Sequence, residues 1–425
     1  MLHLGLICPE LSGHLNPATT LGRELQRRGH RVTVVARLDA RRKAEASGLG
    51  FAAIAEDEFP LGATTQAWAE LGRMSGVLAV RCTAELLRRG AAAILRDAPA
   101  VLQREKIDAL VVDQVAQAGG TVADVLGLPY VTVCHALAMN MDPNVPPGVT
   151  PWPYAPGLLG RTRNALGNAL LRWLAAPIVN EINRERQRHD LEPLGAGFAI
   201  GSRLATIAQQ PACFDFPRQE LPENFHYTGP WYDNASGDEI PFPWEKLDGR
   251  PLIYASMGTL QNRIEETFAT IAEACAGLGS QLVISLGSRD QDATALAKKF
   301  AGGPIVVPFA PQLALLDRAS LIITHAGLNT ALESLSHGLP MVAIPITNDQ
   351  PGVASRLAYL GVAEVVQPGQ LTVARLRTAL ERVLGEPNYR ENARRRQQEI
   401  AQINGLHRAA DIAEQALMKR QPVLR

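Results

Sequence analysis

The sequence lacks several features that mark whole classes of protein. Its 42 lysine and arginine residues are balanced by 42 aspartate and glutamate residues, so no overall field attracts nucleic acid or an anionic membrane surface. The five cysteines are scattered and include no C-x-x-C pair, which argues against a disulfide framework and against a zinc site. We therefore expect a cytoplasmic protein whose partners are small molecules and not nucleic acids.

Membrane and dinucleotide signatures are absent as well. No uncharged run is long enough and free enough of proline to span a bilayer, and the N-terminal stretch LHLGLICP is too short, and lacks the basic flank, for a signal peptide. The glycines near the N terminus do not follow G-x-G-x-x-G. The sequence thus predicts a soluble protein without a transmembrane segment and without a dinucleotide fingerprint.

What the chain does contain is a regular alternation of short apolar runs and amphipathic stretches. The runs are LHLGLIC, RVTVVA, ALVVD and YVTVC in the first half, and LIYAS, QLVISL, PIVVPF, LIIT and PMVAIP in the second. Continuous apolar strands separated by helices are typical of parallel sheets covered on both faces. The predicted fold class is therefore α/β.

A segment rich in proline and turn residues, over residues 214–250, separates the two series and is expected to be a linker. This predicts an N-terminal domain over 1–213 and a similar C-terminal domain over 251–400. Ligands of open parallel sheets bind beyond the carboxyl ends of the strands, so both domains should present loops to a central cleft. Helical spacing from Asn388 to Lys419 predicts a long helix near the C terminus.

An unusually apolar loop over residues 136–160 interrupts this rhythm. It holds one charged residue, several prolines and four large side chains, Met139, Met141, Trp152 and Tyr154. Such a loop either packs against the protein or contacts an apolar ligand, and the sequence leaves both open. The second makes these four residues candidates for an apolar binding pocket.

Two polar residues follow predicted strands of the first half. His14 lies in the loop after LHLGLIC, ahead of a helix for which Asn16 is a plausible N-cap and Pro17 the first turn, and Asp113 ends ALVVD. A lone histidine in a loop is more often ordinary polar surface. Strand-end loops on one sheet edge converge, however, so this pair could be a general base and its orienting carboxylate.

The second half places a helix directly after the strand LIIT, opening on Gly327. The free N–H groups of its first turn form a natural seat for phosphate, and His325 and Asn329 could add donors. Glu333 lies one turn beyond Asn329 on the same face, where a carboxylate can accept hydrogen bonds from both hydroxyls of a ribose. Phosphate and ribose thus fall in nucleotide order.

Neighbouring strand ends supply further candidates. Ser256 and Thr259 lie in a strand-to-turn segment beside a glycine, Phe309 could stack on a base, and Asp349 with Gln350 could bind sugar hydroxyls. Taken singly, each has a bland alternative: a core phenylalanine, ordinary turn residues, or, for Glu333, a solvated helix face. Their order along the chain is what gives them meaning.

That order resembles the donor-binding signature of family 1 glycosyltransferases, which use uridine diphosphate (UDP) sugars. The matching positions are Phe309, Ala310, Pro311, Gln312, His325, Gly327, Asn329, Glu333, Gly338, Pro340, Met341, Pro345, Asp349 and Gln350. Gly13-His14 and Asp113 stand where the family has its catalytic pair, and the resemblance covers nearly the whole chain. It implies the GT-B fold, two Rossmann-like domains facing a central cleft, with a final helix over 401–425 returning to the N-terminal domain.

The resemblance also implies a role for each matching position. Phe309 would stack on the base, Ala310 would meet the uracil edge through its backbone, and Glu333 would hold the ribose. The diphosphate would be bound by His325, Asn329 and Thr330, together with Ser256 or Thr259. Asp349 and Gln350 would hold the sugar. The chain departs from plant members, which usually carry tryptophan at Phe309, serine at Thr330 and cysteine at Ala326.

The implied reaction is an inverting transfer of glucose from UDP-glucose to a lipophilic hydroxylated acceptor, such as a carotenoid, macrolide, steroid or polyphenol. His14 would be the general base and Asp113 its partner, with UDP-glucose as co-substrate and no cofactor or metal. Asp290 and Asp292 form a D-x-D, by which another glycosyltransferase fold binds a metal, but a helix start explains them equally well. A sugar-nucleotide epimerase of the same fold and a non-catalytic sugar-nucleotide binding protein are the alternatives.

Overall fold

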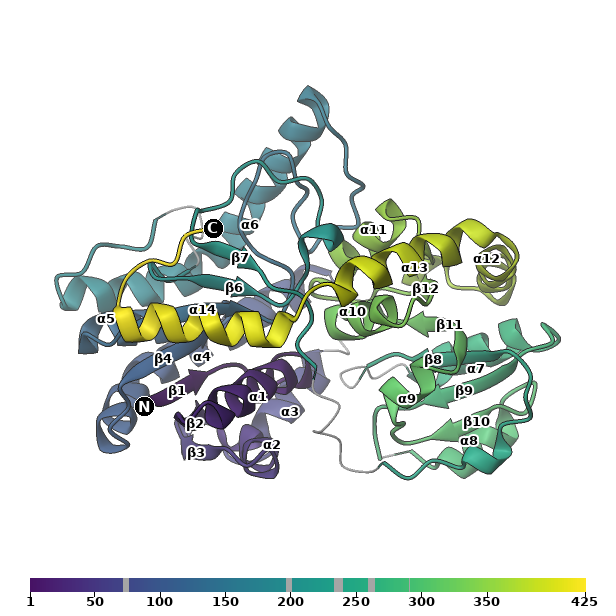
Figure 1. Ribbon diagram of the computed structural model, residues 1–425, viewed down its shortest axis with the longest axis horizontal. Coiled ribbons are helices and arrows are strands. Elements are labelled where there is room, and N and C mark those ends of the chain that lie inside the picture. The colour runs from purple at the N-terminus through teal and green to yellow at the C-terminus, as the bar shows by residue number, and fades with distance from the viewer. Residues whose placement is uncertain (72–75, 196–200, 233–239, 259–263, 290) are drawn as a thin grey trace.

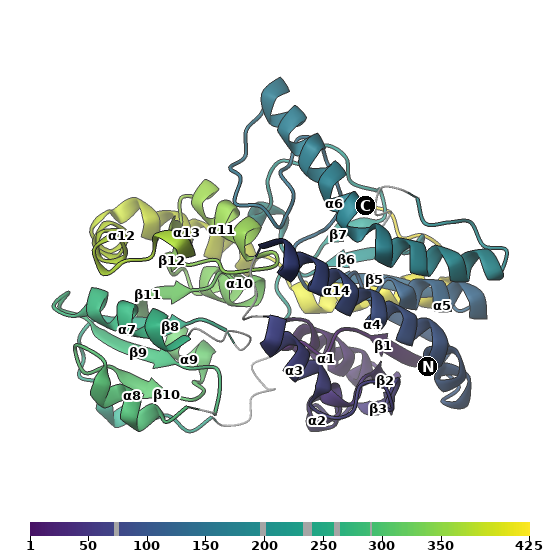
Figure 2. The same ribbon diagram turned by 180° about the vertical axis from the view of Figure 1, so that it is seen from behind.

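The computed structural model of the chain contains two parallel β-sheets, each covered by helices on both faces (Figures 1 and 2). It describes residues 1–71, 76–195, 201–232, 240–258, 264–289 and 291–425. The α/β class predicted from the apolar runs and the two Rossmann-like domains implied by the family resemblance are confirmed.

The N-terminal sheet has seven parallel strands in the order β3-β2-β1-β4-β5-β6-β7. These strands are β1 (His3–Ile7), β2 (Arg31–Ala36), β3 (Gly50–Ala53), β4 (Ala109–Asp113), β5 (Tyr130–Cys134), β6 (Thr206–Ala208) and β7 (Phe225–Tyr227). Its helices are α1 (Ser12–Arg27), α2 (Arg41–Ala46), α3 (Ala63–Leu71), α4 (Gly76–Arg104), α5 (Ala118–Leu126) and α6 (Leu158–Arg188). Strand β7 lies inside the range 214–250 that was expected to be linker, so this sheet extends past the predicted boundary.

The C-terminal sheet has six parallel strands in the order β10-β9-β8-β11-β12-β13. The strands are β8 (Leu252–Ser256), β9 (Gln281–Ser285), β10 (Ile305–Val307), β11 (Ala319–Thr324), β12 (Met341–Ala343) and β13 (Ala363–Val365). The helices are α7 (Ile264–Cys275), α8 (Ala293–Lys299), α9 (Gln312–Leu316), α10 (Leu328–Ser336), α11 (Gln350–Tyr359), α12 (Val373–Gly385) and α13 (Pro387–Ala401).

Central strands of both sheets are buried along their whole length, as continuous apolar runs require. Every residue of β1, β4, β8 and β9 is buried. Because helices cover both faces, polar side chains reach the cleft only where a strand ends. Each sheet therefore positions functional groups at the carboxyl ends of its central strands.

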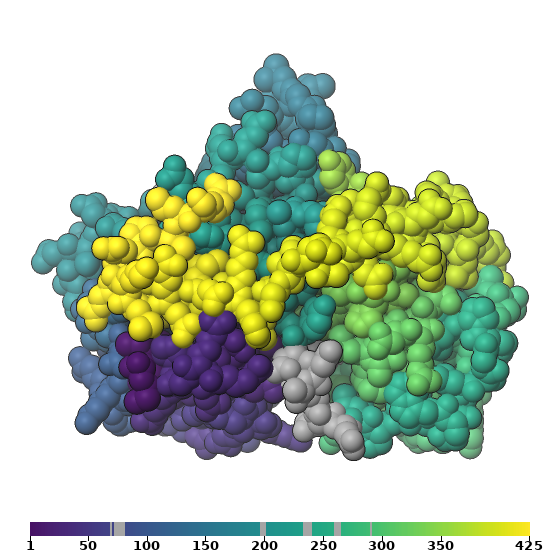
Figure 3. Space-filling view, in the orientation of Figure 1, coloured from purple at the N-terminus to yellow at the C-terminus, as the bar shows by residue number. Residues whose placement is uncertain are grey.

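The chain crosses back to the N-terminal domain at its end (Figures 1 and 3). Helix α14 (Gly405–Lys419) packs against α1, β5 and β6. The single long helix expected over 388–419 is in fact two, because α13 ends at Ala401 and the chain passes close to the N-terminal domain at Gly405. A Cβ at Gly405 would lie 2.7 Å from the carbonyl oxygen of Pro230, so the crossing leaves no room for a side chain there.

A buried ion pair joins the two domains at one side of the cleft. Arg356 of α11 contacts Asp215 of the N-terminal half at 2.7 Å, and the same carboxylate accepts hydrogen bonds from Arg218 and Tyr227. Burial alone would raise the pKa of Asp215, but the positive charges of Arg356 and Arg218 lower it well below its usual range. The pair is ionised and satisfied, which fixes the position of α11 against the N-terminal domain.

Candidate active site

Helix α1 carries the predicted base in its first turn. It begins at Ser12, not after Asn16 as the sequence suggested, so His14 lies within the helix and Pro17 is interior to it. A proline has no N–H to donate to the carbonyl four residues earlier, which here belongs to Gly13. That carbonyl accepts a hydrogen bond from the side chain of Asn329 at 3.1 Å, so a tertiary contact replaces the missing helical bond. This contact explains why the helix can begin earlier than its proline indicates.

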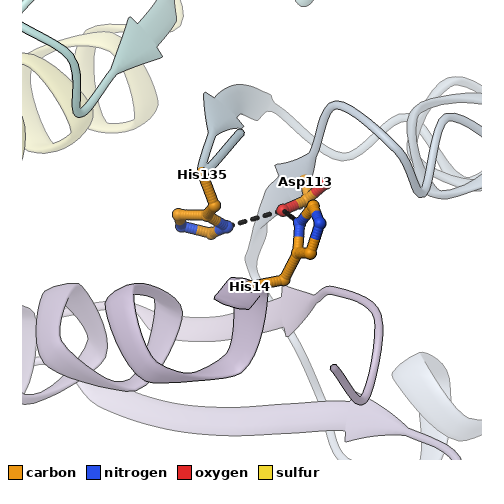
Figure 4. Close-up of side chains that lie close together, drawn as sticks. All are labelled: His14, Asp113 and His135. Carbon is orange, nitrogen blue, oxygen red and sulfur yellow. Dashed lines mark hydrogen bonds and ion pairs between the residues drawn. The ribbon is translucent and has the colours of Figure 1, made fainter. Parts of the chain in front are cut away.

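Asp113, the last residue of β4, is fully buried directly behind His14 (Figure 4). Its Oδ2 accepts hydrogen bonds from His14 Nδ1 at 2.8 Å and from His135 Nδ1 at 2.6 Å, and its Oδ1 accepts one from the backbone N–H of Val115 at 2.7 Å. The predicted pair of His14 and Asp113 is therefore brought together, with a second histidine on the same carboxylate oxygen.

Protonation states follow from these contacts. Burial alone would raise the pKa of Asp113, but the charge of His14 and the hydrogen bonds from both histidines lower it well below its usual range. An ionised carboxylate can only accept, so each histidine presents an Nδ1–H to it. His14 therefore keeps its Nε2 free to accept a proton, which is the tautomer that a general base requires.

The pKa values of the two histidines are shifted in opposite directions. Burial tends to lower the pKa of His14, but the charge and hydrogen bond of Asp113, with the charge of Asp349, raise it above its ordinary value. Burial is the dominant effect on His135 and lowers its pKa, so His135 is the neutral donor of the three. Of the two histidines, only His14 therefore has a raised pKa together with a second ring nitrogen that does not contact Asp113.

His135 is a site residue that the sequence analysis missed. It follows the last residue of β5, the neighbour of β4, and its ring meets the edge of Trp231 at 5.5 Å. Its Nε2 is buried and finds no hydrogen-bond partner among the described residues. Its place after a strand that neighbours β4 is the signal that could have predicted it, by the same convergence of strand ends that applies to Asp113.

The same three side chains have the composition of a metal site. One ligand atom from each of His14, Asp113 and His135 lies within 4.8 Å of the others. In the described structure these atoms hydrogen-bond to one another at 2.6 and 2.8 Å. A bound metal would have to replace both Nδ1–H groups, so the cluster is arranged as a proton-holding triad.

One cavity of about 1280 Å³ lies between the two domains and brings most of the predicted site residues together. His14 lines it from the N-terminal side, while Asp113 stays behind His14 and does not reach the surface of the cavity. The predicted donor residues in its lining are Ser256, Phe309, Ala310, Gln312, His325, Gly327, Asn329, Thr330, Glu333, Asp349 and Gln350. Thr259 and Asp290 lie outside the described residues.

The N-terminus of α10 faces this cavity, as predicted from Gly327. His325 is held between two glycine turns: a Cβ at Gly258 would lie 2.9 Å, and one at Gly327 2.5 Å, from His325 Nε2. Ala326, which lies between His325 and Gly327 in the chain, takes φ +61°, a left-handed conformation that turns the chain sharply into the helix. The close fit leaves no room for a side chain at either glycine, so the imidazole is held beside the first turn of α10.

Burial lowers the pKa of His325 to about 4, against a smaller opposing effect of the Ser256 backbone. The imidazole is therefore neutral near pH 7 and can offer an N–H but no positive charge. Positive potential at this end of the cavity comes from the helix dipole and its unpaired backbone N–H groups. The site suits an anion that is bound mainly by hydrogen bonds.

Glu333 lies one turn further along α10 and contacts Gln312, whose Nε2 donates to its Oε2 at 2.5 Å. Gln312 Oε1 in turn accepts from the hydroxyl of Tyr254 at 3.3 Å. Burial raises the pKa of Glu333 to about 7, against a smaller lowering effect of Gln312. A carboxyl group with this pKa is partly protonated near pH 7, and further hydrogen-bond donors from a ligand would favour its ionised form.

Other residues predicted to bind the sugar donor line the same cavity as His325 and Glu333. The ring of Phe309 is partly exposed to the cavity, with the guanidinium of Arg289 5.8 Å from its centroid. Asp349 is half-buried and accepts a hydrogen bond from the backbone N–H of Leu137 at 3.1 Å, across the domain boundary. Asp292 caps α8 by accepting from the backbone N–H groups of Thr294 and Ala295, which is its helix-start role.

Gln350, at the start of α11, is partly committed to the backbone. Its Oε1 accepts from the N–H groups of Ile346 and Thr347, at 2.8 and 3.0 Å. The side chain thereby closes the loop that carries Asp349 and holds that carboxylate towards the cavity. Through this loop, Gln350 positions the residue beside it as well as lining the cavity itself.

One region of the N-terminal lining of the cavity is apolar. Met139 and Met141 line it, together with side chains from two long helices. These are Leu86, Leu87 and Ile94 from α4, and Leu171, Leu174 and Ile178 from α6. The apolar loop over 136–160 therefore contacts the cavity with its first half.

Trp152 and Tyr154 are not in that lining. Trp152 packs against α6, where a Cβ at Gly167 would lie 2.7 Å from its ring, and the guanidinium of Arg163 lies 5.1 Å from the ring centroid. Tyr154 stacks on Phe216 at 5.4 Å, beside the domain junction. The first half of the loop therefore lines the cavity, where it could contact an apolar ligand. The second half packs against the protein, because Trp152 and Tyr154 have α6 and Phe216 as partners.

Comparison with known proteins decides the family. A model described as UDP-glucoronosyl and UDP-glucosyl transferase matches residues 193–402, and one for glycosyltransferase family 4 matches residues 17–181. Zeaxanthin glucosyltransferase of Pantoea ananas is 31% identical over 425 residues, covering 100% of this chain and 98% of that protein. The chain belongs to the UDP-glucosyl transferase family. The zeaxanthin glucosyltransferase of Pseudescherichia vulneris is 32% identical over 438 residues, with 100% of both chains covered.

Solved structures agree on the architecture of this glycosyltransferase. A calicheamicin glycosyltransferase matches with a TM-score of 0.75 and 24% identity over 99% of this chain and 100% of that one. The glycosyltransferase of kitacinnamycin matches with a TM-score of 0.76 and 22% identity over 97% and 98%. At these identities the likeness shows the fold alone, and it confirms the GT-B prediction.

Membership of a transferase family confirms the enzyme class and leaves the epimerase and the binding-protein alternatives without support. A nucleotide sugar as donor and a small molecule as acceptor follow from the family. Over the residues described, no helix has both the length and the apolar character needed to cross a membrane.

Proposed function

We propose that this glycosyltransferase transfers glucose from UDP-glucose to a hydroxyl group of a carotenoid-type acceptor, with inversion at the anomeric carbon. The observation that carries the proposal is the position of His14. It lies in one cavity between an apolar N-terminal lining and the donor-type residues around α10, with Asp113 hydrogen-bonded to its Nδ1.

The proposed step is a single displacement. The acceptor hydroxyl gives its proton to Nε2 of His14 while its oxygen forms a bond to the anomeric carbon. The bond from that carbon to the diphosphate oxygen breaks, and its electron pair leaves with UDP. Asp113 stabilises the imidazolium that forms. Because the acceptor oxygen attacks from the face opposite the leaving diphosphate, an α-linked donor gives a β-glycoside.

For the donor, we propose that Phe309 stacks on uracil and Glu333 accepts from the ribose hydroxyls. The diphosphate would lie at the N-terminus of α10, beside Asn329 and the neutral imidazole of His325. Asp349 lies in the same lining and would accept from glucose hydroxyls. Charge on the leaving diphosphate is then met by fixed N–H donors, which supports a reaction that needs no metal.

The acceptor class rests on two supports. Two full-length relatives, 31% and 32% identical, carry the name zeaxanthin glucosyltransferase. The cavity also has an apolar lining from α4 and α6 that suits a long hydrocarbon chain, and its volume of about 1280 Å³ is large for a small-molecule site. We place the reaction in the cytoplasm, which agrees with free thiols at all five cysteines.

The test is mass spectrometry of purified enzyme incubated with UDP-glucose and zeaxanthin, a macrolide, a steroid or a flavonoid, with and without a chelator. We expect zeaxanthin to gain one hexose, unchanged by chelator, and NMR of the product to show a β-linkage. Parallel reactions with other UDP-sugars test the donor. Transfer only to non-carotenoid acceptors would overturn the acceptor class, an α-linkage would overturn inversion, and loss of activity with chelator would overturn metal independence.

A further inference from the structure

Gln209 follows the last residue of β6, and its side-chain amide connects the two domains. The residue is 2% exposed and lines the cavity. Its Nε2 donates one hydrogen bond to the backbone carbonyl of His135 and another to Oδ1 of Asn329, at 2.7 Å. His135 is the histidine that holds Asp113 (Figure 4), and Asn329 lies in the first turn of α10. One buried NH₂ group therefore contacts both the base side and the donor side of the cavity.

The amides of Gln209 and Asn329 form a row between two backbone carbonyls. The carbonyl of His135 lies at one end of this amide row, and the carbonyl of Gly13, which accepts from Asn329 Nδ2 at 3.1 Å, lies at the other. A carbonyl oxygen can only accept, so each end of the row must receive an N–H group. Gln209 therefore presents its NH₂ group to His135 and to Oδ1 of Asn329, which leaves Asn329 to present its own NH₂ group to Gly13.

The amide row determines which side of Asn329 can meet a ligand. Nδ2 carries two hydrogens and the bond to Gly13 uses one of them, so the second can be donated to an anion in the cavity. If the amide turned over, its oxygen would face the carbonyl of Gly13 and its NH₂ group would face that of Gln209. Both contacts would be repulsive, and Gln209 is too deeply buried for water to relieve its end.

We propose that Gln209 is a positioning residue for donor binding, which fixes the amide of Asn329 with its NH₂ group available to the diphosphate of the sugar nucleotide. An amide oxygen in that place would repel the phosphate oxygens, so the orientation decides whether Asn329 stabilises the bound diphosphate or opposes it. Gln209 acts through Asn329 and needs no contact of its own with the donor. The inference rests on the proposed function, because it takes the diphosphate to lie at the N-terminus of α10.

Gln114 offers a matched control in the same domain. It is 1% exposed, and its amide bonds the backbone of the loop that starts at Ala136. Gln114→Met therefore removes a comparable buried amide while it leaves the amide row intact. Gln209→Met likewise keeps the approximate length of the side chain and removes its N–H donors.

The test is isothermal titration calorimetry of the full-length enzyme with UDP and with uridine. We expect Gln209→Met to weaken UDP binding about threefold to tenfold, because the Asn329 amide is no longer held in one orientation. Uridine has no diphosphate, so its affinity should stay close to that of the wild type. Gln209→Glu should weaken UDP binding further, since a carboxylate would face two oxygens. Gln114→Met should bind both ligands like the wild type.

A double-mutant cycle shows whether Gln209 acts through Asn329. In the Asn329→Ala background there is no amide left to orient, so Gln209→Met should change UDP affinity less than about twofold. The proposal is wrong if Gln209→Met leaves UDP affinity unchanged in the wild-type background, if it costs as much in the Asn329→Ala background, or if uridine affinity or the Gln114→Met variant shows the same loss.

The wild type separates these outcomes from a failure of the proposed function. If the wild type binds no UDP, the proposed donor is wrong and the role of Gln209 is overturned with it. If the wild type binds UDP but the double-mutant cycle shows no coupling, only the role of Gln209 is overturned.

Discussion

Asn329, in the first turn of α10, donates a hydrogen bond from Nδ2 to the carbonyl oxygen of Gly13, 3.1 Å away in the first turn of α1. Its Oδ1 accepts a second bond from Gln209 at 2.7 Å. Gly13 has a free carbonyl because Pro17, four residues on, has no N–H to donate. One amide thus links the base-carrying helix of one domain to the proposed diphosphate seat of the other.

The first prediction concerns this amide. Asn329→Ala should weaken UDP binding about tenfold to a hundredfold, because it removes a donor to a charged group. Asn329→Asp should weaken it more, since a carboxylate would face both the diphosphate and the carbonyl of Gly13. Isothermal titration calorimetry measures both. Equal UDP affinity in wild type and Asn329→Asp would remove Asn329 from the diphosphate site.

The pH dependence of the base gives a second prediction. His14 must be neutral to accept a proton, so the rate should rise with pH through a pKa that lies above the ordinary value. Asp113 is the main cause of that elevation, so Asp113→Asn should move the acid limb of kcat/KM to lower pH while lowering kcat about a hundredfold or more. A limb that stays in place would mean that His14 is not the titrating group.

We expect His135 to lower the pKa of His14, whereas Asp113 raises it. As a neutral donor to Asp113 it draws off part of the negative charge that raises the pKa of His14. Replacing it with phenylalanine should move the acid limb to higher pH, whereas His135→Asn, which keeps an N–H group, should move it less. Identical pH profiles in wild type and His135→Phe would restrict this histidine to a packing role.

The raised pKa of Glu333 predicts that the affinity for the nucleotide donor depends on pH. Its pKa of about 7 means that the carboxyl group is increasingly protonated, and so loses acceptor capacity, as the pH falls below that value. A donor that hydrogen-bonds the ionised form should bind more weakly at about pH 6 than at about pH 8. UDP should show this dependence and 2′-deoxy-UDP should show less of it. Glu333→Gln should abolish it, and a variant that retained the full dependence would contradict the assignment.

Much of this site could be predicted from sequence because its chemistry is local. Asn329 and Glu333 lie four residues apart on a helix that opens on Gly327, so 3.6-residue periodicity puts both side chains on one face. The parallel sheets followed from apolar runs, and His14 with Asp113 from the convergence of strand ends. These inferences needed no knowledge of distant contacts.

The remainder depended on tertiary packing that no local pattern encodes. Helix α1 begins before its proline, and the carbonyl of Gly13 that Pro17 cannot pair is satisfied by Asn329, far along the chain. Trp152 lies away from the cavity because Gly167 leaves room for its ring. The one helix predicted near the C terminus is two helices, α13 and α14, separated where the chain crosses between domains near Gly405. In each case a long-range contact outweighed a correct local preference.

The most direct test of the account is the single-turnover rate of His14→Ala with UDP-glucose and zeaxanthin, measured beside its affinity for UDP. We predict that transfer falls about a hundredfold to ten-thousandfold, because the acceptor hydroxyl loses its base. UDP affinity should stay close to that of the wild type, since the donor contacts we assign lie in the C-terminal domain. Transfer at the wild-type rate in His14→Ala would contradict the central claim that this histidine, held by Asp113, activates the acceptor.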